Sequence, residues 1–447
     1  RQFNLHHVTG MLMYMQREYR SSVLPERNQG FSGRFTYDYG QRYLVELNFG
    51  YNGTERLAKK ERFEFFPAVS LGWVISNEKF FEPMTKYIDN LKIRGSYGLV
   101  GSDETGLSAG AQHFLYIDQV SLNNIGFTTG VDMNYTLYGP LVTNYAVVNG
   151  GWERVKKLDI GIDLELFRQL TITADYFNEK RYNILLHREA WPESLGYYTA
   201  KPWSNKGKVD NWGIELSVNW RKEFTKDLYV DFRGNFTYTE NKYVNLDEPV
   251  YPYVWKTSTG KPLSRTTGYI AQGLFSSQEE IDNSPTQNLG STVKPGDIKY
   301  RDVNGDGKID GSDQVMISPY GTTPRIQYGL GMNVTYKKFD FGVFFNGSAK
   351  RTIMISGISP FGQSDYNVMQ FIADDYWSES NPNPNAKYPR LTSEGSANNY
   401  TTNSLWVADA SYMKLRTLEL YYNFSQEMMK KSKFIKGAKV FARGHDL

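Results

Sequence analysis

The sequence repeatedly alternates apolar and polar residues with a period of two. Leu158–Leu166 places five aliphatic side chains on one side, and three carboxylates and a glycine on the other. Trp212–Trp220 and Ile326–Tyr336 alternate in the same way, so the pattern recurs in segments of 9 to 11 residues. Successive side chains of a β-strand point to opposite faces of its sheet. The pattern therefore predicts antiparallel strands with one apolar face and one polar face.

The spacing of these segments alternates between very short and very long connections. Three residues separate Phe31–Tyr39 from Tyr43–Tyr51, and three separate Leu158–Leu166 from Leu170–Phe177. Such short links predict tight hairpins. The long, weakly periodic stretches are rich in Gly, Asn, Ser, Tyr and Pro, and we expect extracellular loops at about 102–150, 182–209, 241–323 and 351–404. Short turns at one end and long loops at the other are typical of an outer-membrane β-barrel.

Aromatic residues are abundant beside a modest apolar total. They make up 15% of the chain, against 40% for all hydrophobic residues. Several stand at strand ends, where an aromatic girdle would meet lipid head groups: Trp73, Trp152, Trp212, Trp220 and Tyr336. This composition suits sheets that have one apolar face and one polar face. The alternative is a soluble β protein with these aromatics in its core.

Charge and cysteine content exclude several classes of protein. With 51 basic and 48 acidic side chains, the chain lacks the basic excess of a nucleic-acid-binding protein. The absence of cysteine excludes a disulfide scaffold, a cysteine-ligated zinc site and a thiol nucleophile. No apolar run reaches the ~18 residues of a transmembrane helix. The chain starts without Met and ends in a predicted strand at 439–447, so we expect it to be part of a longer chain.

One segment resembles a calcium-binding loop. The stretch 302–313 reads D-x-N-x-D-G-x-I-D-x-x-D. Six of its residues stand where an EF-type loop supplies oxygens: Asp302, Asn304, Asp306, Lys308 (through its carbonyl), Asp310 and Asp313. The last position holds Asp where Glu is usual, and no amphipathic helix precedes the loop. The alternative is a cluster of Asx and glycine turns without metal. No cofactor is required, and Ca²⁺ is the one candidate.

We find no pattern that predicts an enzyme. None of the five histidines has a zinc-binding spacing such as HExxH. The carboxylates of 159–165 could suggest a glycosidase pair, but alternating lumen-facing polar residues explain them more simply. Candidate substrate contacts are the loop aromatics Tyr197, Tyr198, Trp203, Tyr253 and Trp255, which could stack on sugar rings or peptide side chains. The alternative is that they pack the long loops against one another or against a lid.

Several segments resemble the SusC/RagA-like branch of TonB-dependent outer-membrane transporters. FFPAVSLGW at Phe65–Trp73 is similar to that branch's FFPSVSLGW. Pro295–Asp310 resembles the most distinctive loop of the same branch. Further matches, in family order, are Leu91–Gly98, Trp152–Leu186, Asn205–Glu215, Tyr388–Leu391 and Ser411–Arg416. One residue, Asp210, is inserted relative to the family pattern of the 205–215 segment. The resemblance covers most of the chain.

The resemblance implies an all-β fold, a transmembrane antiparallel barrel of 22 strands with a plugged lumen. Residues 1–447 would form its C-terminal part, without the plug. The implied function is import of oligomeric nutrients, glycans or peptides, across the outer membrane of a Bacteroidota-like bacterium. The implied partners are the TonB complex, a SusD-like surface lipoprotein, the lipid bilayer and the oligosaccharide or peptide ligand, with no nucleic acid. The alternatives are a passive porin or adhesin, and a soluble secreted glycan-binding β protein.

Overall fold

The computed structural model describes residues 2–20, 25–104, 115–147, 150–195, 201–355, 368–392, 396–425, 435 and 437–447. The chain divides into two compact units. The larger comprises Arg1–Val250, Gln327–Gly347 and Met413–Leu447, and the smaller comprises Tyr251–Ile326 and Ser348–Tyr412.

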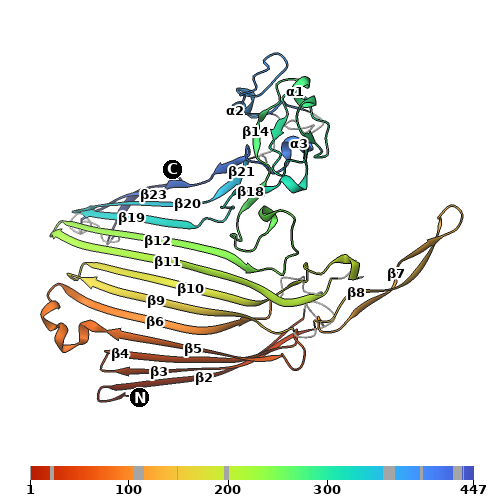
Figure 1. The fold of residues 1–447 in the computed structure, drawn as a ribbon. Coiled ribbons are helices and arrows are strands. Elements are labelled where there is room, and N and C mark those ends of the chain that lie inside the picture. Colours follow the sequence, from red (N-terminus) through yellow and green to blue (C-terminus); the bar gives the residue numbers. More distant parts are fainter. Residues whose placement is uncertain are drawn as a thin grey trace. The chain divides into compact units, whose positions relative to one another are not determined.

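An antiparallel sheet of fourteen strands dominates the described part of the larger unit (Figure 1). In spatial order the strands are β1 (Gln2–Phe3), β2 (His6–Tyr19), β3 (Glu26–Tyr39), β4 (Tyr43–Thr54), β5 (Phe63–Val74), β6 (Ile88–Ser102), β9 (Glu153–Leu166), β10 (Leu170–His187), β11 (Trp203–Thr225), β12 (Leu228–Asn245), β19 (Ile326–Tyr336), β20 (Phe339–Ala349), β23 (Tyr412–Asn423) and β24 (Lys439–His445). Neighbours in space are also neighbours along the chain, apart from strands inserted in the long connections. The all-β prediction is confirmed.

The short connections are tight turns with left-handed residues. Gly40 and Gln41 have φ of +59° and +54°, and Phe167 and Arg168 both have +54°. Two successive positive φ values are typical of the type I′ turn, whose twist matches that of the flanking strands. These turns lie between β3 and β4 and between β9 and β10, where the sequence predicts hairpins.

The two faces of the sheet differ in polarity from β4 to β10. Apolar side chains on one face are exposed, including Leu47 (46%), Leu71 (57%), Ile160 (48%) and Ile162 (44%). The opposite face carries alternating polar residues, among them Asp159 on β9 and its register partner Ser96 on β6. A wide apolar face without cover is unfavourable in water and suits contact with lipid.

The predicted loop at 182–209 is wrong at both ends. β10 continues to His187 and β11 begins at Trp203, so these strands run well past the alternating segments. The pairing of β10 with β11 shifts register between Arg181 and Ile184, which marks a β-bulge. A bulge adds one residue and breaks the period of two while the backbone pairing goes on. The alternation is therefore lost before the strand ends.

The predicted loop at 102–150 contains a hairpin of its own. β7 (Gln119–Thr129) and β8 (Tyr135–Asn144) pair as a two-stranded antiparallel sheet with several register shifts. Turns η1 (Ile75–Asn77) and η2 (Lys79–Met84) connect β5 to β6, and η3 (Glu193–Leu195) follows β10.

Trp152 departs from the predicted aromatic girdle. Trp73, Trp212 and Tyr336 are exposed as expected, but only 5% of Trp152 is exposed. Its ring packs edge-on against Phe66 with centroids 5.3 Å apart, and its Nε1 donates to a backbone carbonyl. Trp152 stands just before β9, where it fills the interior of the loop end and so cannot face lipid.

The smaller unit consists of short elements around an apolar core. These are η4 (Val254–Lys256), β13 (Thr266–Gly268), β14 (Ala271–Leu274), α1 (Gln278–Asp282), β15 (Thr286–Gln287), β16 (Ile298–Tyr300), β17 (Lys308–Ile309), η5 (Gly311–Asp313), β18 (Val315–Ser318), β21 (Thr352–Met354), α2 (Gln370–Ala373), α3 (Ala397–Tyr400) and β22 (Val407–Asp409). Ile298, Tyr300, Ile309, Ile372 and Trp406 are almost completely buried in its core. No helix among the described residues is long and apolar enough to cross a membrane.

A buried ion pair joins the two segments of the smaller unit. Asp297 has no exposed surface, and its Oδ1 lies 2.7 Å from Arg390 Nε. Asn399 Nδ2 donates to the same oxygen at 2.8 Å, and the backbone N–H of Lys294 donates to Oδ2 at 2.8 Å. Gly296 has φ of +85°, and a Cβ there would lie 2.2 Å from the Trp377 ring. The PGDIKY and YPRL segments, recognised from the sequence, therefore meet in space.

We expect Arg390→Leu to destabilise the smaller unit by about 3–5 kcal/mol, because Asp297 would remain buried without its cation. Hydrogen exchange of peptides from 294–300 and 396–406 measures this effect in the full-length protein. Arg301→Leu is the matched control, since Arg301 is an exposed arginine of the same unit. Equal exchange in the two variants would contradict the proposed role of the ion pair.

Candidate functional site

The acidic loop 302–313 folds on its own backbone. Asp302 accepts hydrogen bonds from the N–H groups of Gly305 and Gly307, at 2.7 and 2.8 Å. Asp313 is fully buried and accepts from Val303 at 2.8 Å and from Asp310 at 2.9 Å. The bonds to Asp302 and the bond from Asp310 close short turns of the chain, and the bond from Val303 joins the two ends of the loop.

The remaining predicted ligands take part in the same turns. Asp310 caps the short helix η5, and the backbone and side-chain hydrogen bonds from Ser312 hold the pKa of its carboxyl below the ordinary value. Asp306 accepts from the backbone N–H of Lys308 at 2.9 Å and from Asn304 Nδ2 at 2.8 Å. Among the described residues, no three His, Cys, Asp or Glu side chains are arranged to hold a metal ion. This geometry supports the turn cluster, and Ca²⁺ binding stays a prediction.

Two predicted aromatic contacts lie against this acidic loop. The rings of Tyr253 and Trp255 stack with centroids 4.8 Å apart and planes inclined by 11°. Trp255 Nε1 donates to the Ser312 carbonyl at 2.8 Å, and Asn304 Nδ2 donates to Tyr253 Oη at 3.1 Å. These contacts match the alternative that such aromatics pack the loops together, while part of each ring surface stays accessible.

The other predicted aromatics belong to the larger unit. Trp203 stacks on His187 with centroids 3.6 Å apart, and its Nε1 donates to Asn144 Oδ1 at 2.9 Å. Trp203 therefore connects the beginning of β11 to β10 and to β8 of the β7–β8 hairpin. Tyr197 and Tyr198 lie outside the described residues.

We expect Asp313→Asn to destabilise the smaller unit by about 1–3 kcal/mol, because it weakens an acceptor of several buried N–H groups. The loss should be the same in EDTA and in millimolar calcium. Thermal unfolding followed through Trp fluorescence measures it, with Asp306→Asn as the exposed control. An effect that depends on calcium would contradict the turn cluster and support the metal loop.

Ion pairs cover the polar face of the sheet. Arg94 on β6 lies 3.2 Å from Asp159, 3.4 Å from Asp163 and 2.6 Å from Asp175. Gly161 sits between them, and a Cβ there would lie 2.3 Å from an Asp175 oxygen. The missing side chain thus lets arginine and carboxylate meet across β9. Of the carboxylates of 159–165 that could suggest a glycosidase pair, Asp159 and Asp163 form ion pairs with Arg94.

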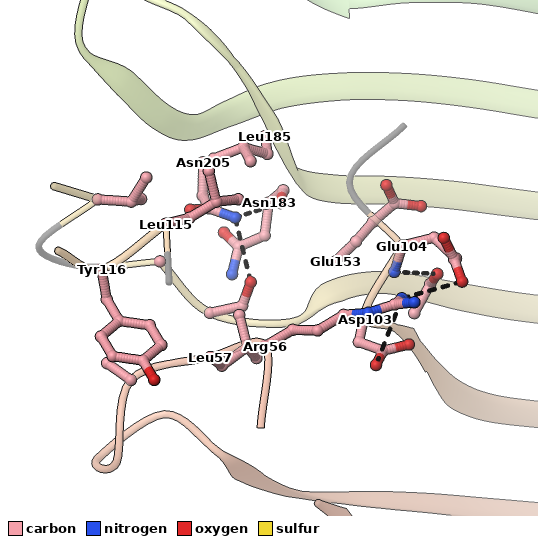
Figure 2. A pocket seen from close by; sticks show the side chains of 15 residues that line it. Arg56, Leu57, Asp103, Glu104, Leu115, Tyr116, Glu153, Asn183, Leu185 and Asn205 are labelled. Carbon is pink, nitrogen blue, oxygen red and sulfur yellow. Dashed lines mark hydrogen bonds and ion pairs between the residues drawn. The ribbon is translucent and has the colours of Figure 1, made fainter. Parts of the chain in front are cut away.

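A pocket lies in the larger unit, among the connections that follow β4 and β6, and Figure 2 shows the side chains that line it. Its cavity volume is about 30 Å³, and the pocket is open to solvent. Its charged lining residues are Arg56, Asp103, Glu104 and Glu153, and its aliphatic ones are Leu57, Leu115, Val147 and Leu185. Sequence reasoning missed this pocket, because its walls come from six segments that are far apart along the chain.

Arg56 organises the charged side of the pocket. Its guanidinium lies 2.9 Å from Glu26, 3.0 Å from Glu104 and 3.7 Å from Asp103. The Arg56 side chain is 12% exposed, whereas that of Glu104 is 66% exposed. One cation thus faces three carboxylates, of which Glu104 is the most accessible. Glu153 is paired with Arg181.

The β10 bulge shapes the opposite wall. Asn183 has φ of +60°, a conformation that Asn tolerates better than most residues. Its carbonyl accepts from Asn205 Nδ2 at 2.8 Å, and the Gly151 carbonyl accepts from the same group at 3.1 Å. Two carbonyl partners fix the orientation of the Asn205 amide. Its Oδ1 is buried without a hydrogen-bond partner among the described residues.

Comparison with known proteins identifies the sheet. The family model described as "TonB dependent receptor-like, beta-barrel" matches residues 9–426. The chain belongs to this family. TonB-dependent receptor P3 of Formosa agariphila is 25% identical over 90% of this chain and 39% of its own length. TonB-dependent receptor SusC of Bacteroides thetaiotaomicron is 26% identical over 88% of this chain and 37% of its own.

Solved structures share the fold. The RagAB peptide transporter superposes with a TM-score of 0.70 at 16% identity, over 100% of this chain and 50% of that one. The RagAB peptide importer in its 'open-open' state gives 0.71. The resemblance to SusC/RagA-like transporters and the outer-membrane location are thereby confirmed. The chain spans about two fifths of the length of the curated relatives named above.

Proposed function

We propose that the protein containing this chain imports oligomeric nutrients, glycans or peptides, across the outer membrane. The observation that carries the proposal is the two-faced sheet: an exposed apolar face opposite a face of charged and polar side chains. Only closed barrels and helices satisfy their backbone in lipid, and a barrel with a polar interior provides a passage. Family membership supports the same function.

The polar face is suited to passage by binding and release. Its arginine and carboxylates are paired with one another around Gly161, which leaves few unbalanced charges to trap a solute. A second hollow on this face is lined by polar residues, several glycines and Phe344, and it offers the hydrogen-bonding groups of Asn219, Arg233, Asn235 and Glu419. Transport then requires no covalent chemistry, and the protein acts as a transporter and not as an enzyme.

The long connections provide the outer capture region. Two of them, 251–326 and 348–412, fold together as the smaller unit around a shared core. The Tyr253–Trp255 pair presents stacked rings there, of the kind that pack on sugars or apolar side chains. We infer that a SusD-like surface lipoprotein closes over bound substrate. Energy comes through TonB, as the names of the curated relatives suggest for those proteins.

The test uses the full-length protein, expressed with its neighbouring genes and extracted with and without detergent. We expect recovery in detergent alone, with a lipoprotein in comparable amount. Uptake of the co-purified ligand by cells should stop when TonB is deleted. A detergent-only protein without partner or TonB dependence would favour a passive porin or adhesin. Full recovery in buffer would contradict the barrel and favour a soluble glycan-binding protein.

A further inference from the structure

The polar-face hollow, formed by β11, β12, β19, β20 and β23, is large enough for a ligand. Its cavity volume is about 490 Å³, and all its lining residues belong to the larger unit. Sites for small molecules in proteins usually measure about 300–1,000 Å³. These strands are consecutive neighbours in the sheet, so the hollow lies on one continuous wall.

Glycines on two neighbouring strands form the floor of the hollow. Gly329 and Gly331 belong to β19, and Gly342 belongs to β20. A Cβ at Gly329 would lie 2.9 Å from Asn235 Oδ1, and a Cβ at Gly342 would lie 2.9 Å from Asn333 Oδ1. The missing side chains therefore leave the space that these amides border. Glycine inside a strand often marks a place where a ligand approaches the backbone closely.

An aromatic ring lies over this glycine floor. A Cβ at Gly329 would lie 3.2 Å from Phe344 Cζ, and a Cβ at Gly331 would lie 3.2 Å from Phe344 Cδ2. One edge of the ring thus runs above both glycines. The side chain is 37% exposed although it belongs to the polar face. The next residue, Phe345, points to the apolar face because side chains of a strand alternate. Contact with lipid therefore does not account for Phe344.

Three asparagine amides line the same hollow. They belong to Asn219 on β11, Asn235 on β12 and Asn333 on β19. Within the part of the chain that the structure describes, none of these three side chains has a hydrogen-bond partner. Each amide offers one acceptor oxygen and two N–H donors. The hollow thus presents neutral groups that can both donate to a ligand and accept from it.

The charged side chains of the hollow already have partners. Arg233 Nε lies 2.9 Å from Asp231 Oδ1, and Glu419 Oε1 lies 2.7 Å from Arg443 Nε. An ionic ligand would have to compete with these pairs. The groups that remain available are the neutral amides and the aromatic ring, so the hollow favours an uncharged ligand.

We propose that this hollow binds a neutral sugar residue of an oligosaccharide. The inference rests on the import function proposed above and names glycans as its substrate class. A pyranose has a face of C–H groups, which packs on the Phe344 ring. Its hydroxyls are both donors and acceptors, and they exchange hydrogen bonds with the free amides. A peptide backbone offers one N–H and one C=O per residue, so it matches fewer of these groups.

The test measures binding of neutral oligosaccharides to the full-length protein in detergent. The probes are maltohexaose, laminarihexaose, xylohexaose and mannohexaose, and a pool of uncharged hexapeptides represents the rival substrate class. Isothermal titration calorimetry gives the affinities. We expect at least one hexaose to bind and the hexapeptides not to bind. Hexapeptide binding without hexaose binding would overturn the proposal.

Matched variants on β20 separate the ring from the fold. Phe344→Leu removes the aromatic surface of the hollow and should weaken hexaose binding about fivefold, the scale of an aromatic contact. Phe345→Leu makes the same change on the opposite face and should leave the affinity unchanged. Asn235→Ala combined with Asn333→Ala removes two amides without changing the charge, and it should weaken binding about tenfold. Wild-type affinity in the Phe344 variant and in the double variant would overturn the proposal.

A cysteine in the hollow reports where the sugar binds. Asn219→Cys, in the full-length protein cleared of other cysteines, should react with a maleimide in the absence of sugar, and a bound hexaose should slow this reaction. A cysteine that the maleimide never reaches, or one that the hexaose does not protect, would contradict the proposed site. TonB-dependent uptake of the co-purified ligand by wild-type cells tests the import function separately.

Discussion

The large sheet depends on one constraint, which is that every backbone N–H and C=O within a bilayer must be satisfied by the protein itself. Antiparallel neighbours meet this demand through unbroken ladders, as between β9 and β10, where thirteen consecutive pairs run from Leu170 to Tyr182. Once the ladder is fixed, the period of two assigns each side chain to lipid or to the interior. The exposed aliphatic side chains and the ion pairs of the polar face are two consequences of the same backbone geometry.

Charge placement on the polar face follows from this geometry. Arg94 reaches three carboxylates on two neighbouring strands only because Gly161 leaves space between them. A charged group in a low-dielectric wall is costly unless it is paired. The interior surface can thus be polar enough for solutes and still compatible with a stable barrel. At the loop end, Arg56 is likewise paired with three carboxylates, those of Glu26, Asp103 and Glu104.

Local sequence predicts the hairpins well, because strand period and turn length are encoded within about twenty residues. Prediction from local sequence fails where the alternation is interrupted, or where the residues in contact are far apart along the chain. The bulge after Arg181 hides the last part of β10, and Trp152 resembles a girdle residue although it is buried against Phe66. Asp297 and Arg390 are 93 positions apart, so nothing near either residue predicts their ion pair. In the acidic loop, Asp302 accepts from the N–H groups of Gly305 and Gly307, as the turn-cluster alternative predicts, and Ca²⁺ binding stays a prediction.

The central claim is that alternate residues of these strands face lipid and the interior. The chain contains no cysteine, so single cysteines can be placed in it freely. Fluorophores would be attached at Ile214→Cys, Leu216→Cys and Ser217→Cys in the full-length protein, cleared of other cysteines and reconstituted in vesicles. Quenching by brominated lipid chains should be strong at the first two positions and weak at the third. Equal quenching at all three positions, or the reverse order, would contradict a membrane-spanning barrel.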